Sequence, residues 1–183
     1  FLDFQAQTVR LYRDGTMEMT VIDHIIKKSI FPRGVFDFFD DVGIDVMHQS
    51  VLNYTENSKD IDFYKPMIDF MADLISRKRL GRKSGSGCYE YPIDRLLESL
   101  PGMEIQDEII SLPRAVFINS FFKEIEKNKY SIDDLECAVM EYMDMDLGPR
   151  VMAEKTGHGA IRDILNRNFN ETGFEAYRPS SLL

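Results

Sequence analysis

The stretch Phe31–Asp45, with the sequence FPRGVFDFFDDVGID, constrains the fold of this chain more than any other. Pro32 fixes its own backbone and disfavours a helical conformation at the residue before it, while Gly34 allows the chain to turn tightly. The helical spacing of the next apolar residues predicts a short helix, and Gly43 lies where a glycine commonly ends one. A second helix is expected from Ile44. The stretch therefore predicts a helix, a glycine corner and a further helix.

The short helix of this stretch has an apolar side and an acidic side. The acidic residues recur at helical spacing, and such a helix face is usually solvated. They have no visible partner for acid–base chemistry. The acidic residues are Asp37, Asp40, Asp41 and Asp45, and the apolar ones are Val35, Phe36, Phe39 and Val42.

The chain contains a second copy of this stretch. A constant offset of 114 converts Gly34–Gly43 into Gly148–Gly157, and it holds without gaps over about forty positions. Such an offset predicts a tandem repeat. We expect a first repeat at residues 1–100 and a second, divergent repeat at residues 101–183, packed on each other as a pseudo-dimer. No strand pattern of any length is present in the sequence, so the expected fold is all-α with about ten helices.

Apolar spacing and capping residues predict the remaining helices. Thr16 or Thr20 is expected to cap the second helix, and Ser131 to cap a later one. Pro113 is expected in the first turn of its helix. The predicted ranges besides the corner are Phe1–Arg13, Pro66–Arg77, Ile93–Leu100, Leu112–Lys127, Ile132–Met143 and Gly157–Phe169, followed by a tail from Glu171.

Charge and composition argue against several classes of protein. The net charge of −9 does not suit a nucleic-acid-binding surface. No apolar run approaches the roughly 20 residues of a membrane span. The two cysteines, Cys88 and Cys137, are far apart in sequence, which indicates a reducing, cytoplasmic setting. Because position 1 is Phe1 rather than Met, we expect the chain to begin inside a larger protein.

The sequence does not contain a recognisable set of residues for a complete active site. His24 is expected in the core or at its boundary, and His48 lacks the third ligand that a metal site needs. His158 lies between two glycines, which fits a functional turn and a helix start equally well. Neither cysteine has the neighbouring histidine of a nucleophile. The basic run RKRLGRK at 77–83 is interpreted as a solvated helix end, with an anion contact as the alternative. We therefore expect no catalytic, cofactor-binding or metal-binding residue, and an interaction or substrate-covering role.

Three segments carry a resemblance to a known family. They are TVRLYRDG at 8–15, IDHIIKKSIFPRGVFDFFDDVGID at 22–45 and LGRKSGSGCYEY at 80–91. Together they resemble the C-terminal domain of 3-hydroxyacyl-CoA dehydrogenases, a helical fold like the C-terminal domain of 6-phosphogluconate dehydrogenase. Val35 stands where the family usually has proline, and Cys88 where it usually has phenylalanine. The second half resembles, more weakly, the second repeat of the fused multifunctional enzymes.

The resemblance implies an activity whose catalytic parts lie elsewhere. Enzymes of this family oxidise L-3-hydroxyacyl-CoA and pass hydride to NAD. They use a His–Glu pair on an N-terminal dinucleotide-binding domain and an Asn at the start of the first C-terminal helix. That part would lie upstream of Phe1, so NAD is expected in the full-length enzyme and not on this chain. Asn119 belongs to the helix motif of the second repeat. The implied partners are the chain's own N-terminal domain, the acyl-CoA substrate and, as in single-repeat members, a homodimer.

The part of the family's site that the resemblance carries over is the wall opposite the cofactor. It comprises Pro32, Arg33, Gly34, Val35 and Phe36, with Phe36 expected nearer the surface than the buried Phe39. The head of Arg33 is expected in solvent, with a phosphate or carboxylate contact as the alternative. The isolated chain is expected to be inactive. The competing hypotheses are a stand-alone helical interaction module without oxidoreductase activity, and a dehydrogenase for another 3-hydroxy acid.

Overall fold

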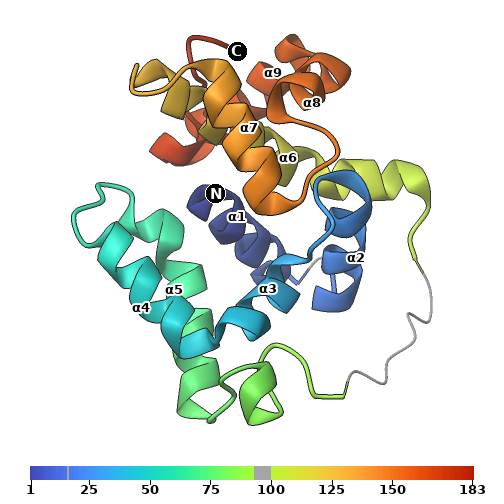
Figure 1. Ribbon diagram of the computed structural model, residues 1–183, viewed down its shortest axis with the longest axis vertical. Coiled ribbons are helices and arrows are strands. Elements are labelled where there is room, and N and C mark those ends of the chain that lie inside the picture. The colour runs from blue at the N-terminus through green and yellow to red at the C-terminus, as the bar shows by residue number, and fades with distance from the viewer. Residues whose placement is uncertain (16, 93–99) are drawn as a thin grey trace.

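The computed structural model describes residues 1–15, 17–92 and 100–183, and its regular structure is helical (Figure 1). Within those ranges β-type pairing is limited to isolated bridges of Ser86 with Gly81 and Glu90, so the all-α prediction is confirmed. The short helix predicted at Ile93–Leu100 and the cap predicted at Thr16 fall on residues outside these ranges, apart from Leu100. The elements are α1 (Leu2–Arg13), α2 (Met19–Ser29), α3 (Val35–Val42), α4 (Ile44–Thr55), α5 (Ile61–Ser76), η1 (Arg82–Ser84), α6 (Met103–Glu126), α7 (Ile132–Met143), α8 (Pro149–Thr156), α9 (His158–Thr172) and η2 (Glu175–Tyr177).

The glycine corner has the predicted form. Gly34 directly precedes α3, and Gly43 joins α3 to α4 with φ +105°, a conformation that favours glycine. Ser131 caps α7 as predicted, because its hydroxyl accepts the N–H of Asp134 at 3.1 Å. The prediction for Thr20 is wrong, since α2 begins at Met19 and Thr20 therefore lies inside the helix.

Two helices begin earlier than predicted. α5 begins at Ile61 and α6 at Met103, so Pro66 and Pro113 lie inside helices rather than in first turns. A proline inside a helix removes a backbone hydrogen bond and crowds the preceding turn. On the N-terminal side of each proline a side chain is buried, Phe63 in α5 and Ile110 in α6. We attribute the longer helices to this packing, which offsets the local cost.

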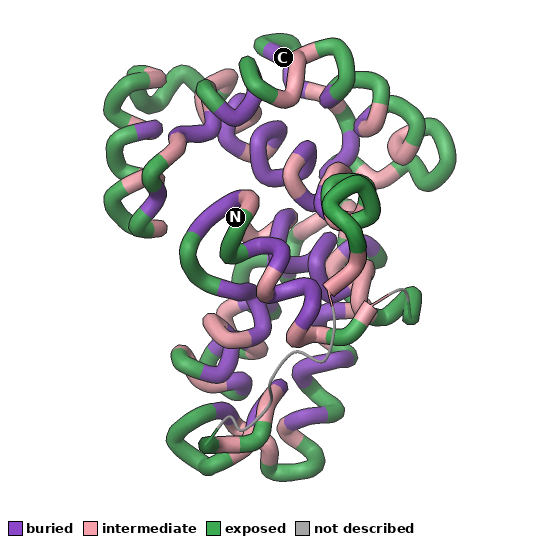
Figure 2. The backbone as a smooth tube through the Cα atoms, turned by 90° about the vertical axis from the view of Figure 1, so that its right-hand side faces the viewer, coloured by how far each residue is buried: buried purple, intermediate pink, exposed green. Residues whose placement is uncertain are grey.

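Helix α1 lies at the centre of the molecule. It packs against α5 on one side and against α6 on the other (Figure 1). Phe4 of α1 is fully buried and contacts the rings of Phe31 and Phe117, with centroids 5.2 and 5.8 Å away. Buried segments accordingly run through the middle of the molecule (Figure 2). Because α1 contributes to both sides, one continuous core connects the two halves of the chain.

The two halves place similar helices in the same order. The bounds of α3 and α8 differ by 114 at both ends. The glycines that follow them have similar backbone angles, φ +105° and ψ 128° at Gly43, and φ +88° and ψ 119° at Gly157. The glycines that precede them, Gly34 and Gly148, have φ −71° and −72°. A tandem repeat predicts such agreement, and the repeat and its boundaries stay a prediction.

The residues after α9 form an ordered strap. The side-chain amide of Asn119 donates to the carbonyl of Ala176 at 3.2 Å, and its oxygen accepts the N–H of Ser180 at 2.8 Å. The hydroxyl of Tyr177 donates to the side chain of Gln7 in α1. The predicted tail is therefore held between α6 and α1, and Asn119 and Gln7 are two of the residues that hold it.

Candidate functional site

The five residues expected at a cleft wall divide into two groups. Pro32 and Arg33 are exposed and line a cavity of about 290 Å³ between the corner and the end of α7. Gly34, Val35 and Phe36 are buried beneath them. We call the space beside Pro32 and Arg33 the corner cavity. The corner thus offers a surface through its first two residues, while the next three belong to the core.

The prediction that Phe36 lies nearer the surface than Phe39 is wrong. Both side chains are 0% exposed, and their ring centroids are 6.3 Å apart. Phe36 also contacts the rings of Tyr12 in α1 and Phe70 in α5, at 5.5 and 5.9 Å. These two helices cover the face of α3 that the local sequence left open. Phe36 is therefore a residue of the core rather than of the cleft.

A buried carboxylate fixes the start of α3. Asp23 of α2 accepts the N–H groups of Phe36 and Asp37 at 3.1 and 2.9 Å, and the hydroxyl of Tyr89 at 2.8 Å. It satisfies free N–H groups of the first turn as a capping residue does, although it belongs to another helix. A Cβ at Gly34 would overlap the side chain of Asp23. The missing side chain at Gly34 therefore gives the carboxylate access to α3.

Burial raises the pKa of Asp23 to about 6, while the hydrogen bonds from α3 and Tyr89 oppose this rise. The folded state therefore binds this proton more tightly than the unfolded state, in which an Asp pKa is about 4. The resulting stabilisation is complete below about pH 4 and is lost as the pH rises through about 6. We expect Asp23 to lower the free energy of unfolding by about 2–3 kcal/mol across this window.

The check is an NMR titration of the Asp23 carboxyl group together with urea unfolding at both ends of the window. The Asp23→Asn variant should lack this component of the pH dependence. A midpoint for Asp23 near pH 4 would contradict the expectation, and this measurement on the unmodified chain does not depend on whether the variant folds.

A second buried carboxylate ties the loop after α5 to α3. Asp40 accepts the N–H groups of Cys88 and Tyr89 at 2.7 and 2.9 Å, and the hydroxyl of Tyr91 at 2.8 Å. A Cβ at Gly87 would overlap its carboxylate. The prediction of a solvated acidic face is therefore wrong for Asp40, which is 1% exposed. Its partners lie 48 to 51 residues later, so helical spacing could not reveal them.

The basic run pairs with carboxylates of the same chain. Arg82 contacts Asp37 at 3.0 Å and Asp41 at 2.5 Å, and Arg79 pairs with Glu90. These pairs are partly exposed, so each contributes little to stability. Arg79 and Arg82 therefore already pair with carboxylates of the same chain. For these two residues the pairs support neither interpretation of the basic run, a solvated helix end or a contact with an external anion.

The histidines and cysteines form no reactive group in the ranges that the structure describes. His24 is half-buried, its Nε2 atom has no hydrogen-bond partner there, and burial lowers its pKa. Burial raises the pKa of the Cys88 thiol, and Cys137 is exposed. No three His, Cys, Asp or Glu side chains in these ranges are placed to hold a metal ion. Nor is any helix there long and apolar enough to cross a membrane.

Comparison with known proteins relates this architecture to a family. A family model described as "3-hydroxyacyl-CoA dehydrogenase, C-terminal domain" matches residues 1–91. Residues 1–91 form a C-terminal domain of the 3-hydroxyacyl-CoA dehydrogenase family. The match contains the glycine corner and both anchoring carboxylates, Asp23 and Asp40. The expected family is thereby confirmed. The chain carries the C-terminal domain that is found in this family of oxidoreductases.

Relatives of this dehydrogenase domain are much longer than the region that matches. Mitochondrial hydroxyacyl-coenzyme A dehydrogenase of Mus musculus is 30% identical over 89 residues, which are 48% of this chain and 28% of the relative. A probable 3-hydroxyacyl-CoA dehydrogenase of Caenorhabditis elegans is 28% identical over 88 residues, 46% of this chain and 28% of the relative. The crystal structure of 3-hydroxybutyryl-CoA dehydrogenase from Escherichia coli K12 has a TM-score of 0.80 and 17% identity, covering 98% of this chain and 56% of that one. This likeness extends the shared fold over both halves.

The 3-hydroxyacyl-CoA dehydrogenase domain presents a rigid corner beside an open cavity. The corner cavity is lined by side chains of the corner, of Phe1 and of the end of α7, and no histidine is among them. Among the residues that the structure describes, Asp144 supplies a carboxylate to its lining and Arg33 a guanidinium group. The arrangement can bind and shield a ligand, and its described lining holds no His–Glu pair that could take a proton from a hydroxyl group.

Proposed function

We propose that this chain is the substrate-covering and assembly domain of an NAD-dependent 3-hydroxyacyl-CoA dehydrogenase of fatty-acid β-oxidation. It would act with a dinucleotide-binding domain that is not among these 183 residues. The observation that carries the proposal is the corner cavity, which opens at Pro32 and Arg33 within the family's C-terminal domain. A cavity with one cation and no acid–base pair suits a wall that binds substrate more than a reaction centre.

The glycine-rich loop of this chain, at residues 81–87, does not fit NAD. A dinucleotide needs free N–H groups in a glycine-rich loop at the start of a helix. The glycine-rich loop here is occupied, because the N–H groups of Cys88 and Tyr89 already donate to the carboxylate of Asp40. We therefore assign NAD binding to the separate dinucleotide-binding domain, and no step on this chain passes through it.

The contribution of this chain is positional. Asp23 holds the first turn of α3, and Asp40 holds the following loop against the same helix. These contacts make the corner rigid, so that Pro32 and Arg33 form a fixed edge for an acyl-CoA. Covering the reacting carbon in this way excludes water from the cleft.

The proposal includes two packed repeats, residues 1–100 and 101–183, in which the second takes the place of a partner subunit. Glu136 of α7 supports this, because it accepts the N–H of Arg150 at the start of α8, as Asp23 does for α3. A Cβ at Gly148 would overlap Glu136, as one at Gly34 would overlap Asp23. The cytoplasmic location stays a prediction, since relatives from mouse and rat are named mitochondrial.

The test compares the 183-residue chain with the protein in which it is joined to its dinucleotide-binding domain. We expect NADH formation from 3-hydroxyacyl-CoA only in the joined protein. Arg33→Ala should raise the KM of the joined protein about tenfold by removing one charge-assisted contact, with the melting temperature unchanged. Arg13→Ala, at the exposed end of α1, is the matched control and should leave KM unaltered.

Turnover by the chain alone would contradict the proposal, and so would a joined protein that oxidises no 3-hydroxyacyl-CoA. An unaltered KM in Arg33→Ala would remove Arg33 from the substrate wall. In that case the head of Arg33 is simply solvated.

A further inference from the structure

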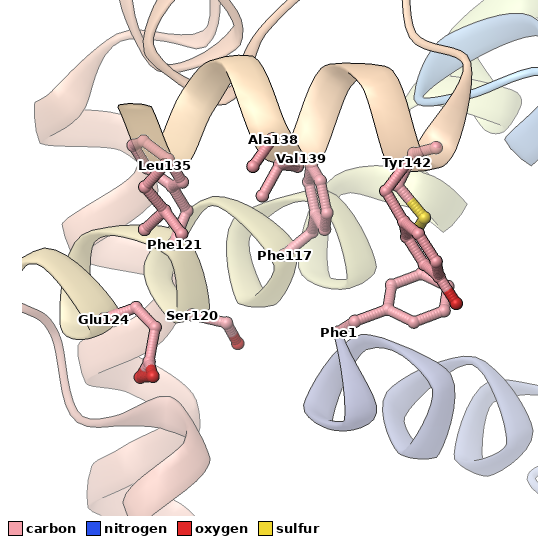
Figure 3. Close-up of a pocket in the computed structure, with 10 residues that line it drawn as sticks. Phe1, Phe117, Ser120, Phe121, Glu124, Leu135, Ala138, Val139 and Tyr142 are labelled. Atoms are coloured by element: carbon pink, nitrogen blue, oxygen red, sulfur yellow. The ribbon is translucent and has the colours of Figure 1, made fainter. Parts of the chain in front are cut away.

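A second cavity, of about 350 Å³, lies between α6 and α7 (Figure 3). Phe117 and Phe121 of α6 form its floor and are at most 5% exposed. Leu135 and Val139 of α7 form its wall and are half-buried. Leu135 and Val139 are four positions apart and therefore lie on one face of α7. The side chain of Ala138 is small and exposed, so the middle of this cavity is open. We call the cavity the α6–α7 groove.

The α6–α7 groove continues into the corner cavity. Phe1 and Tyr142 line both spaces, and Figure 3 shows them together at one end of the groove, with Glu124 at the other. The corner cavity carries the charges of Arg33 and Asp144, whereas nearly all of the groove lining is apolar. The combined space is therefore polar at the corner and apolar along α7, which matches an amphiphilic, elongated ligand.

We infer that the α6–α7 groove holds the hydrocarbon chain of a medium-length acyl-CoA whose thioester end lies in the corner cavity, an inference that rests on the proposed function. A water-sized group takes up roughly 30 Å³ of liquid volume, so the groove has room for roughly ten methylene-sized groups. Along the groove, from Leu135 to Tyr142, the axis of α7 advances about 10 Å. An acyl chain there would bury the half-exposed faces of Leu135, Val139 and Met143, and this burial is the source of its affinity.

The test is calorimetric titration of the 183-residue chain with butyryl-CoA and decanoyl-CoA. Each buried methylene tightens binding roughly fourfold, so decanoyl-CoA should bind at least roughly a hundredfold more tightly. Ala138→Trp places a large ring in the middle of the groove and should abolish this difference without lowering the melting temperature. Cys137→Trp is the matched control, because Cys137 is exposed on the same helix and lines a different cavity.

Equal affinity for the two acyl-CoAs, or no saturable binding of decanoyl-CoA, overturns the inference. A chain-length effect that survives Ala138→Trp, or is equally lost in Cys137→Trp, overturns it as well. Sedimentation provides a further check. A dimer that dissociates in Ala138→Trp would assign the groove to a second copy of the chain instead.

A kinetic measurement separates this inference from the proposed function. In the joined protein, Ala138→Trp should lower kcat/KM for 3-hydroxydecanoyl-CoA and leave that for 3-hydroxybutyryl-CoA unchanged. One outcome contradicts the proposed function alone: the joined protein oxidises neither substrate, while decanoyl-CoA binds the unmodified chain and does not bind Ala138→Trp. In that case the assignment of the α6–α7 groove to an acyl chain is still supported. If both substrates are oxidised and Ala138→Trp affects them equally, the groove is wrong and the function stands.

Discussion

Replacing Phe36 by alanine should destabilise the fold as much as replacing Phe39, by about 3–5 kcal/mol in each case. Both rings are 0% exposed. Removing either ring leaves a cavity between α3 and its neighbours that the helices can close only partly. Urea unfolding of the two alanine variants of the 183-residue chain measures these costs.

Phe38 provides the matched control for this experiment. It lies on the same helix but is only partly buried, with its ring against that of Phe1 at 5.9 Å. Phe38→Ala should therefore cost clearly less than the other two variants. If Phe36→Ala costs no more than Phe38→Ala, Phe36 faces a cleft after all and the packing described for α3 is wrong.

Asp40→Asn is expected to cost about 2–4 kcal/mol. An amide keeps one acceptor oxygen and places an NH₂ group against N–H or O–H donors that were bound to the carboxylate. Hydrogen bonds to a charged group contribute about 1.5–3 kcal/mol each, and a buried donor left without a partner adds its desolvation penalty. The N–H groups of Cys88 and Tyr89 should also lose their protection from hydrogen exchange.

Asp41→Asn is the control for Asp40→Asn. Asp41 is the next residue of α3, is exposed, and pairs with the exposed side chain of Arg82. Loss of such a pair costs less than about 1 kcal/mol. Equal losses in the two variants, or unchanged exchange at Cys88, would show that Asp40 does not hold the loop.

The features that the sequence could predict are those that depend on neighbouring residues. The glycine corner was predictable because Gly34 and Gly43 act within one turn of the helix that they bound. The Ser131 cap was predictable because its partner, Asp134, lies three residues later. The apolar spacing of α3 likewise identified its buried face, so the helical class of the fold followed from local pattern alone.

The features that were missed depend on contacts between distant segments. Asp40 looked solvated because its donors lie in a loop some 50 residues later. Phe36 was expected at the cleft because the resemblance places this corner there, and α1 and α5, which cover Phe36, could not be placed from local spacing. Asp23 belonged to the quoted family motif without an assigned role. The available signal was the pairing of a carboxylate with a glycine at a position where there is no room for a side chain.

The strap after α9 has a consequence for the order in which the chain folds. The contact of Tyr177 with Gln7 joins residues 170 positions apart, and another joins Ala176 to Asp60. Closing such distant pairs is slow compared with forming helices. On the ribosome, α1 and α5 are complete long before the strap and α9 are made. Until α6 and then the strap have been made, α1 lacks its partners on one side, and the nascent chain passes through a state with exposed hydrophobic surface that is prone to aggregate.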